Sequence, residues 1–374
     1  MRILLQNSLF YPNLAGGAES STLLLARELS GRGHLVHVLT SDGRPGDGAA
    51  PLASYRVEGI SGRVHHAPSA GSLPLLTGAE TSPGLMAKAR HHLQNVHDRA
   101  WRRRTTELLV ELAPEVVHTN NLVGLTTAVW RAAKGARVPV VHTLRDFHLL
   151  CPRTTLLRSD GTVCERRPLP CVALSKAKLR HSHHVDVVTS PTRFNLDRHV
   201  AGGAFPRARR EVVPNACEDL PDDVADRTGR DRVRVLYLGT VAAHKGVPEL
   251  LGAMERIVAD PGLAHVDLDV GGAGDLVGEV EAFAARHAPR CRYLGVIRGE
   301  AKRRALEAAD LVVVPSTCLD NFPRVILDAF SHALPVVGSD RGGIPEVVRD
   351  DEDGLITAPE PAALARAIGE LARD

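Results

Sequence analysis

Asp310-Leu-Val-Val-Val-Pro315 opens the stretch of sequence that decides the fold, and Pro323-Arg-Val-Ile-Leu-Asp328 and Val336-Val-Gly338 continue it. The β-branched run at 311–314, ended by a proline, is typical of a buried strand. Pro323 suits the first turn of a helix, where its missing N–H costs nothing. Apolar residues then recur at helical spacing, and a second buried strand follows at 336–337. The stretch predicts one strand–helix–strand unit of a parallel sheet.

Two carboxylates flank the loop between the first strand and the helix of this unit. Asp320 lies in the loop, and Asp328 follows on the helix. In open α/β sheets ligands bind at this carboxyl end of the strands. The helix N-terminus offers N–H groups and partial positive charge to a phosphate, and carboxylates hold polyol hydroxyls. A sugar nucleotide has this chemistry; the alternative is a turn residue and a solvated acid.

The same stretch resembles the Glu-x7-Glu motif of the retaining, group 1 glycosyltransferases. In that family the motif reads Pro-Ser-x-x-Glu-x-Phe-Gly-x-x-x-x-Glu-Ala-Met-Ala, followed by Gly-x-Pro-Val-Val. The positions that match in register are Pro315, Ser316, Phe322, Ala329, Pro335, Val336 and Val337. Asp320 and Asp328 stand at the two glutamates, and Pro323 stands at the glycine.

The resemblance implies an α/β fold of GT-B architecture, with two Rossmann-like parallel-sheet domains facing each other across a cleft. We expect an acceptor-side domain at 1–217 and a nucleotide-sugar-binding domain at 233–374. Residues 218–232, nearly all charged, Pro or Gly, predict the linker. Strands and helices alternate in each half, which independently favours two parallel sheets.

Glycine loops follow the first strand of each half. Gly16-Gly17 allows the backbone to approach a ligand, or simply makes a tight turn. In the second half Lys245-Gly246 follows the first strand, and a lysine there can offset the charge of a diphosphate. The resembled family has Gly-Arg-x4-Lys-Gly at this place, and Thr240 replaces its arginine. We therefore hypothesise that Arg324, at the phosphate-facing helix end, supplies the missing positive charge.

The resemblance implies that Asp320 binds hydroxyls of the transferred sugar and that Asp328 binds the donor ribose. Asp320, Lys245 and His118 are the catalytic candidates. The donor-binding candidates are Gly16, Gly17, Thr240, Lys245, Gly272, Asn321, Phe322, Pro323, Arg324, Val325 and Asp328.

The acceptor side is expected at the carboxyl ends of the strands 116–119 and 138–143. His118 and Asn120 end the first strand, and Arg145-Asp146 ends the second. In the resembled family a His-x-His and a His-Asp lie near the acceptor. Asn120 stands at the second histidine of the former and Arg145 at the histidine of the latter. His118 as a buried strand residue is the alternative to a functional role.

No metal and no cofactor are predicted. Asp267-Leu-Asp269 looks like the metal-binding Asp-x-Asp of the other glycosyltransferase architecture, but it lies inside a strand with both acids on one face. Cys151, Cys164 and Cys171 with His148 lack the close Cys-x2-Cys pair of a zinc site. The neighbouring Gly272-Ala-Gly274 misses the Gly-x-Gly-x-x-Gly register of dehydrogenases.

Composition limits the partners of the chain. The 374 residues carry a net charge of +2, which implies no nucleic-acid partner, and 3% aromatics, which argue against a carbohydrate-binding module of stacked rings. No apolar run is long enough to span a membrane, and scattered cysteines favour a cytoplasmic location. Residues 84–112 predict one basic helix, either a solvated face or a peripheral contact with the inner face of the membrane.

These observations predict transfer of a hexose from a nucleotide-diphosphate sugar to an acceptor hydroxyl, with retention of configuration. The acceptor class is a glycan, a lipid-linked sugar or a small molecule, as in polysaccharide biosynthesis. The alternatives are a sugar-nucleotide epimerase on the same fold and a non-catalytic sugar-nucleotide-binding subunit. Members of the resembled family have a longer tail, so we expect a chain that stops soon after Leu371 to be either trimmed or naturally short.

Overall fold

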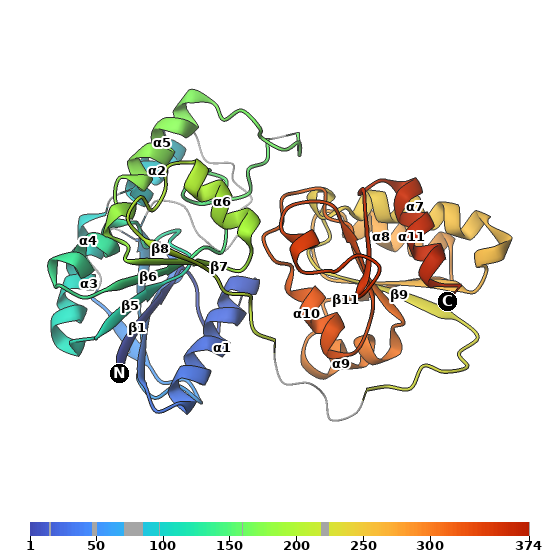
Figure 1. The fold of residues 1–374 in the computed structure, drawn as a ribbon, viewed down its shortest axis with the longest axis horizontal. Coiled ribbons are helices and arrows are strands. Elements are labelled where there is room, and N and C mark those ends of the chain that lie inside the picture. Colours follow the sequence, from blue (N-terminus) through green and yellow to red (C-terminus); the bar gives the residue numbers. More distant parts are fainter. Residues whose placement is uncertain are drawn as a thin grey trace. The chain divides into compact units, whose positions relative to one another are not determined.

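The protein is seen here in a computed structural model that describes residues 1–14, 16–46, 51–70, 85–96, 98–158, 160–217 and 224–373. The chain divides into two compact units, each with a sheet covered by helices (Figure 1). Met1–Leu156 and Cys164–Asn215 form the first unit; Leu157–Val163 and Ala216–Asp374 form the second. The division at Asn215 lies near the domain end expected at 217, whereas the assignment of Leu157–Val163 to the second unit was not foreseen.

The first unit is built on an eight-stranded sheet. In sheet order its strands are β3 (Ala53–Tyr55), β4 (Val64–Ala70), β2 (Leu35–Gly46), β1 (Arg2–Asn7), β5 (Val116–Thr119), β6 (Val140–Thr143), β7 (Val187–Ser190) and β8 (Arg209–Val212). Neighbouring strands are parallel except β3 and β4, which are antiparallel. The sequence did not predict β4, because His65 and His66 interrupt its apolar pattern.

Helices lie on both faces of this sheet, α1 on one side and α3 and α4 on the other (Figure 1). The helices are α1 (Gly17–Gly31), α2 (Leu85–Val96), α3 (Arg99–Leu112), α4 (Ala128–Gly135), α5 (Leu169–Leu179) and α6 (Arg193–Ala201). Under α1, Leu23 and Ala26 pack on Ile3 and Leu5 of β1 and on Val38 of β2. Apolar side chains one helical turn apart therefore seal this face of the sheet.

The single helix expected over 84–112 is wrong, because the structure has two helices there. Asp98 begins α3, and its carboxylate accepts a hydrogen bond from Trp101 N at 2.9 Å. An aspartate that satisfies an N–H of the first turn stabilises a new helix start, which is the physical reason for the break. Residue 84 of the expected helix lies outside the described residues.

The second unit has a six-stranded sheet in which every neighbouring pair is parallel. In sheet order the strands are β11 (Cys291–Gly295), β10 (Val266–Gly271), β9 (Val233–Leu238), β12 (Leu311–Val314), β13 (Val336–Ser339) and β14 (Gly354–Thr357). The strand predicted at 311–314 is confirmed with the same bounds. Sheet order reverses between β9 and β12, so the carboxyl ends of these two strands form the topological switch point.

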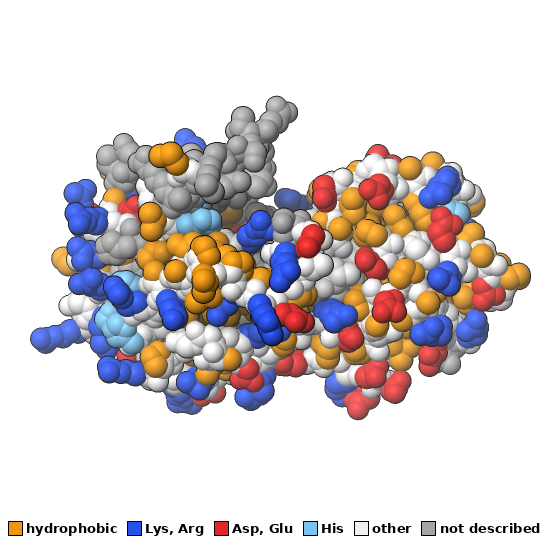
Figure 2. Space-filling view, turned by 90° about the horizontal axis from the view of Figure 1, so that it is seen from above, with side chains coloured by type: hydrophobic (Ala, Val, Ile, Leu, Met, Phe, Trp, Pro, Cys, Tyr) orange, Lys and Arg blue, Asp and Glu red, His pale blue; other side chains and the backbone are white. Residues whose placement is uncertain are grey.

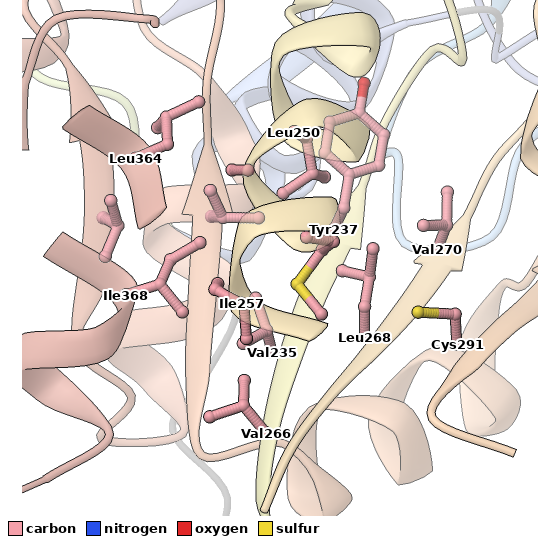
Figure 3. Close-up of a cluster of buried hydrophobic side chains, with 14 of the residues drawn as sticks. Val235, Tyr237, Leu250, Ile257, Val266, Leu268, Val270, Cys291, Leu364 and Ile368 are labelled. Carbon is pink, nitrogen blue, oxygen red and sulfur yellow. The ribbon is translucent and has the colours of Figure 1, made fainter. Parts of the chain in front are cut away.

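The helices of this unit are α7 (Val247–Ala259), α8 (Val277–Arg286), α9 (Gly299–Ala308), α10 (Arg324–Ser331) and α11 (Pro361–Leu371). Figure 1 shows α7, α8 and α11 on one side of the sheet and α9 and α10 on the other. Side chains alternate along β9 accordingly. Val235 and Tyr237 enter the core under α7 and α11 (Figure 3), whereas Leu236 packs with Ile326 of α10.

The end of the predicted linker is docked on the second unit. Arg227 Nε donates to the carbonyl of Ala309 at 2.7 Å, and Arg230 pairs with Asp310 at 2.9 Å. These arginines thus satisfy carbonyls after α9, where cations also meet the negative end of the helix dipole. Residues 218–223 of the linker lie outside the described part of the chain.

Candidate functional site

The loops after β9 and β12 meet at the switch point of the second unit. Cys318 N donates to the carbonyl of His244 at 3.1 Å, which fastens one loop to the other. Gly246 has φ +76°, and a Cβ built on it would lie 1.8 Å from the carbonyl oxygen of Pro315. Only glycine permits this approach, so the Lys245-Gly246 sequence is what brings the two loops together.

Lys245, Asp320 and Ser316 form one hydrogen-bonded group at this junction. Lys245 Nζ lies 2.6 Å from Asp320 Oδ1, and Ser316 Oγ donates to Asp320 Oδ2 at 2.6 Å. Burial alone would lower the pKa of the Lys245 ammonium, but the charge of Asp320, the charge of Cys318 and the hydrogen bond to Asp320 together outweigh burial, and the pKa is raised. Lys245 therefore remains a cation, and both oxygens of Asp320 are held in place.

Asp328 is held by a partner that the sequence did not suggest. Its Oδ2 lies 2.7 Å from Nζ of Lys302 on α9, while the two side chains keep 21% and 34% of their surfaces exposed. Asp328 lies in the second turn of α10, as expected. A lysine on a neighbouring helix therefore balances the second carboxylate of the site, just as Lys245 balances the first.

The start of α10 lies between the two carboxylates in sequence. Pro323 occupies the N-cap position with φ −62° and ψ 117°, so the helix begins at Arg324, one residue later than expected. The side chains of the predicted donor-binding segment are half-buried: Asn321, Phe322, Pro323, Arg324 and Val325. This helix end presents N–H groups and partial positive charge beside Asp320.

The loop after β9 and the loop after β10 approach each other closely through their backbones at Gly272. A Cβ on Gly272, whose φ is +146°, would lie 1.8 Å from the carbonyl oxygen of Gly239. Thr240 follows directly, and its carbonyl accepts a hydrogen bond from the hydroxyl of Tyr237 at 2.6 Å. Gly272 and Thr240 thus lie on the same carboxyl edge of the sheet as Lys245, as the sequence predicts.

In the first unit, the Gly16-Gly17 loop precedes α1 and carries an unforeseen acid. Gly16 is the N-cap of α1, and a Cβ on it would lie 3.2 Å from Glu19 Oε2. Glu19 is 6% exposed, and burial raises its pKa, although hydrogen bonds from the backbone of Glu19 and Gly16 lower it. The Glu19 carboxyl therefore already occupies N–H groups of the loop that the sequence assigned to a phosphate.

The acceptor-side candidates lie together at the ends of β5 and β6. His118 Nε2 is 2.7 Å from the hydroxyl of Thr143, and Asn120 accepts from Arg145 Nε at 3.2 Å. Burial, and then the charge of Arg145, lower the pKa of His118 to about 4. His118 is consequently a neutral imidazole at pH 7.

Asp146 turns toward the interior of the first unit. Its Oδ1 accepts a hydrogen bond from the backbone of His148 at 2.8 Å. Burial raises the pKa of Asp146 to about 6, against the His148 hydrogen bond and the charge of Lys178, which lower it. Asn120 is 1% exposed, and its Nδ2 atom makes no hydrogen bond within the described structure.

The two acids of Asp267-Leu-Asp269 are engaged by arginines. Asp267 pairs with Arg232 at 2.5 Å, and Asp269 pairs with Arg292 at 2.6 Å and Arg234 at 3.6 Å. Across the described ranges, no three His, Cys, Asp or Glu side chains are grouped to hold a metal ion. Cys151, Cys164, Cys171 and His148, whose spacing lacks a zinc motif, likewise form no such group.

The basic face expected on residues 84–112 is narrower than the sequence suggests. Arg104 is 3% exposed and lies over the ring of Trp101, 5.5 Å from its centroid, so it faces inward. Arg99 and Arg103 are exposed. Figure 2 shows Lys and Arg side chains scattered over the visible face of the first unit, on the left of the view. Among the described helices, none is long and apolar enough to cross a bilayer.

The fold and the site define a two-unit α/β protein with a cation- and carboxylate-lined switch point in its second unit. Residues 16–216 match the family described as glycosyl transferase 4-like domain, and residues 232–374 match glycosyl transferases group 1. The chain belongs to the group 1 glycosyltransferases, and its fold is GT-B.

Relatives and solved structures agree with this family. The chain is 26% identical to phosphatidyl-myo-inositol mannosyltransferase of Mycobacterium tuberculosis, covering 95% of this chain and 82% of that protein. It is 29% identical to D-inositol 3-phosphate glycosyltransferase of Xylanimonas cellulosilytica, covering 96% and 84%. Sucrose-phosphate synthase of Thermosynechococcus elongatus has a TM-score of 0.69 at 20% identity, covering 100% of this chain and 91% of that chain. HepE of Anabaena, solved with UDP, has a TM-score of 0.67 at 18% identity, and the match covers 100% of this chain and 90% of that chain.

Proposed function

We propose that the protein transfers a hexose from a nucleotide-diphosphate sugar to an acceptor hydroxyl, with retention of anomeric configuration and without a metal ion. The observation that carries the proposal is the switch-point group of Lys245, Asp320 and Ser316 beside the start of α10. Related structures solved with UDP, and with UDP-glucose, support a nucleotide-sugar donor.

Each charged group has a role in the proposed donor complex. Lys245 and the N-terminus of α10 neutralise the diphosphate, and Arg324, the first residue of α10, adds the charge that Thr240 cannot supply. Asp320 binds hydroxyls of the sugar, and Asp328 binds those of the ribose. As the glycosidic bond breaks, negative charge grows on the leaving diphosphate, which is where these cations act most strongly.

The acceptor side is proposed for the first unit, at His118, Asn120, Arg145 and Asp146. A neutral His118 accepts or donates a hydrogen bond without carrying charge to the acceptor. The backbone N–H groups at Gly16-Gly17 bind the donor only if the Glu19 carboxyl releases its hydrogen bonds to the backbone there. The acceptor is a glycan, a lipid-linked sugar or a small molecule bearing a hydroxyl.

A cytoplasmic location with peripheral membrane contact is proposed for the same protein. Met86 and Leu93 of α2 are 87% and 65% exposed, and Arg99 and Arg103 of α3 are exposed nearby in sequence. Apolar side chains beside basic ones bind anionic bilayers. Co-sedimentation with vesicles that contain anionic lipid, compared with neutral vesicles, tests this contact, and equal sedimentation with both contradicts it.

One experiment tests the proposed reaction directly. The purified chain is incubated with UDP-, GDP-, ADP- and TDP-sugars, with and without acceptor mixtures and with a chelator. We expect one donor to release its nucleoside diphosphate faster with acceptor, and the chelator to leave the rate unchanged. NMR of the product anomeric proton tests retention; an inverted product contradicts it.

A second candidate is a non-catalytic subunit that binds a sugar nucleotide. It is favoured by the departures from the family motifs at Asn120, Arg145 and Thr240. Such a subunit shows saturable donor binding by saturation-transfer NMR but no release of nucleoside diphosphate with any acceptor mixture.

A further inference from the structure

One face of α5 lies along the segment that follows β6 in the first unit. Lys178 Nζ donates to the carbonyl of His148 at 2.9 Å, and Ser175 Oγ donates to that of Leu149 at 2.9 Å. Arg167 continues the seam, because its guanidinium reaches both the carbonyl of Leu150 at 3.0 Å and Ser175 at 3.1 Å. His148 and Leu149 therefore meet successive turns of α5 in reverse order, and Leu150 meets Arg167 just before the helix begins.

The next positions along the two chains hold cysteines, Cys171 on α5 and Cys151 on the facing segment. Cys171, Ser175 and Lys178 are spaced four and three residues apart, so they share one face of α5. The helix and the segment run in opposite directions: Lys178 lies opposite His148, and Ser175 lies opposite Leu149. Continued in the same directions, this order leads to Cys171 on the helix and to Cys151 on the segment. Neither cysteine is in a disulfide, and both are half-buried.

The electrostatics of Cys171 agree with this geometry. Burial raises the pKa of the Cys171 thiol, and negative charge on Cys151, and then on Cys164, raises it further. Arg153 and Arg167 oppose these effects. Among the cysteines, Cys151 thus interacts most strongly with Cys171, and Cys164 is the second neighbour.

We propose that Cys151 and Cys171 are a redox modification site, which closes into an intramolecular disulfide in the presence of a low-molecular-weight disulfide such as oxidised glutathione. The thiolate of one cysteine attacks a sulfur of glutathione disulfide, forms a mixed disulfide and releases one glutathione thiolate. The second cysteine thiolate then attacks the protein sulfur of the mixed disulfide and releases the second glutathione. Two protein thiols lose their protons, and one glutathione disulfide is reduced to two thiols.

The bond fastens α5 to the chain that follows Arg145 and Asp146. Within the described residues from 151 to 168, regular pairing is limited to the isolated bridge between Leu157 and Val163. A crosslink between Cys151 and Cys171 closes this irregular segment into a loop and lowers the entropy of the unfolded chain. The oxidised protein is therefore more heat-stable than the reduced protein.

The sequence makes the pairing directly readable by peptide mapping. Trypsin, which cuts after Lys and Arg but not before Pro, leaves Cys151, Cys164 and Cys171 on separate peptides, 146–153, 159–166 and 167–176. The full-length protein is equilibrated with oxidised or reduced glutathione, its remaining thiols are alkylated, and the digest is analysed by mass spectrometry. After oxidation we expect peptide 146–153 to be joined to peptide 167–176 by a disulfide. We also expect the number of titratable thiols to fall from six to four.

Three variants sharpen the test. Cys171→Ser removes the crosslink and the gain in melting temperature, whereas Cys164→Ser keeps both. Cys217→Ser is the matched control, because Cys217 is exposed and lies far along the chain from this seam.

A dominant crosslink to peptide 159–166, mixed glutathione adducts alone, or six unreacted thiols each overturn the proposal. Far-UV circular dichroism of the reduced variants, with a cooperative thermal melt, shows that each variant is folded.

Discussion

Lys302 Nζ lies 2.7 Å from Asp328 Oδ2 and joins α9 to α10 on the side of the sheet where the second carboxylate of the candidate site lies. Lys245 stands in the same relation to Asp320, at 2.6 Å. Each carboxylate of the site is therefore paired with a lysine from another element. A paired carboxylate is held in position and still offers lone pairs to the hydroxyls of a ligand.

Asp328→Ala is expected to weaken donor use roughly ten- to a hundred-fold in kcat/KM, since a charge-assisted hydrogen bond contributes about 1.5–3 kcal/mol. Lys302→Met should raise the donor KM less, by roughly three- to ten-fold, and leave kcat nearly unchanged, because it only loosens Asp328. Steady-state kinetics on the donor give both values. Lys302→Arg should recover most of the loss.

The double variant separates positioning from direct binding. If Lys302 acts through Asp328, Lys302→Met costs nothing further once Asp328 is alanine. Fully additive losses would mean that Lys302 acts on the donor independently of Asp328.

Lys245→Met should lower kcat/KM by about a hundred-fold, because it removes a cation facing the diphosphate and leaves the Asp320 carboxylate with the hydroxyl of Ser316 but without its cation. Asp320→Asn keeps the shape but removes the charge, and should lower kcat more than it raises KM. Chromatography of the released nucleoside diphosphate over time gives kcat and KM for both variants. An Asp320→Asn enzyme with wild-type kcat contradicts the role proposed for this carboxylate.

Arg324→Ala tests the charge proposed to replace the missing arginine at Thr240. Loss of one cation near a diphosphate should weaken donor affinity by roughly ten-fold. Thr240→Arg, which restores the family residue, should recover affinity in the Arg324→Ala background. Isothermal titration with the nucleoside diphosphate measures each step; an unchanged affinity of Arg324→Ala refutes the assignment.

Gly342→Ala should damage the loop that carries Asp320. Gly342 has φ +66°, and a Cβ on it would lie 2.2 Å from the carbonyl oxygen of Asp320. Gly295 has φ +68°, but a Cβ on it would meet no atom within 4 Å. Gly295→Ala therefore has the same backbone strain without a collision of the added Cβ. We expect Gly342→Ala alone to lose donor affinity, with both variants losing about 1 kcal/mol of stability from strain. Denaturant melts and donor titrations distinguish the two effects.

Most of the second unit was predictable because its signals are local. The run at 311–314 is buried on both faces of a parallel sheet, so its β-branched pattern specifies the strand without further context. The loop carrying Asp320 and the helix carrying Asp328 are predicted by the same strand–helix–strand pattern. The meeting of Lys245 with Asp320 also follows, because the carboxyl ends of β9 and β12 are neighbours at a switch point.

What the sequence did not predict depends on tertiary packing. Lys302 was not recognised, because its direction depends on how α9 packs against α10, far along the chain from Asp328. Arg104 reads as one charge of a basic face, yet it stacks on Trp101 inside the first unit. Glu19 was not singled out, because its burial depends on the turn at Gly16. No periodicity in the sequence marks these three contacts.

Acid should destabilise the first unit as pH falls from 6.5 toward 4, because buried histidines of this unit resist protonation in the folded protein. Burial lowers the pKa of His65, His118 and His199 to about 4, from an ordinary value of 6.5. A histidine whose pKa is lower in the folded protein contributes stability above pH 6.5 that is lost as pH falls toward 4. Asp146, with its pKa raised to about 6, and Glu19, whose pKa burial also raises, act in the opposite direction over part of this range. The three histidines outweigh these two carboxyls, because each histidine adds a slope of up to about 1.4 kcal/mol per pH unit.

Amide hydrogen exchange at β5 and β7, measured between pH 7 and pH 4.5 and corrected for intrinsic rates, reports the free energy of unfolding of this unit. We expect that free energy to fall with pH, and to fall less steeply in His118→Gln. His183→Gln is the control, because His183 is exposed. If the wild-type protein and His118→Gln lose stability in parallel, the buried imidazole of His118 is not the group that acid protonates.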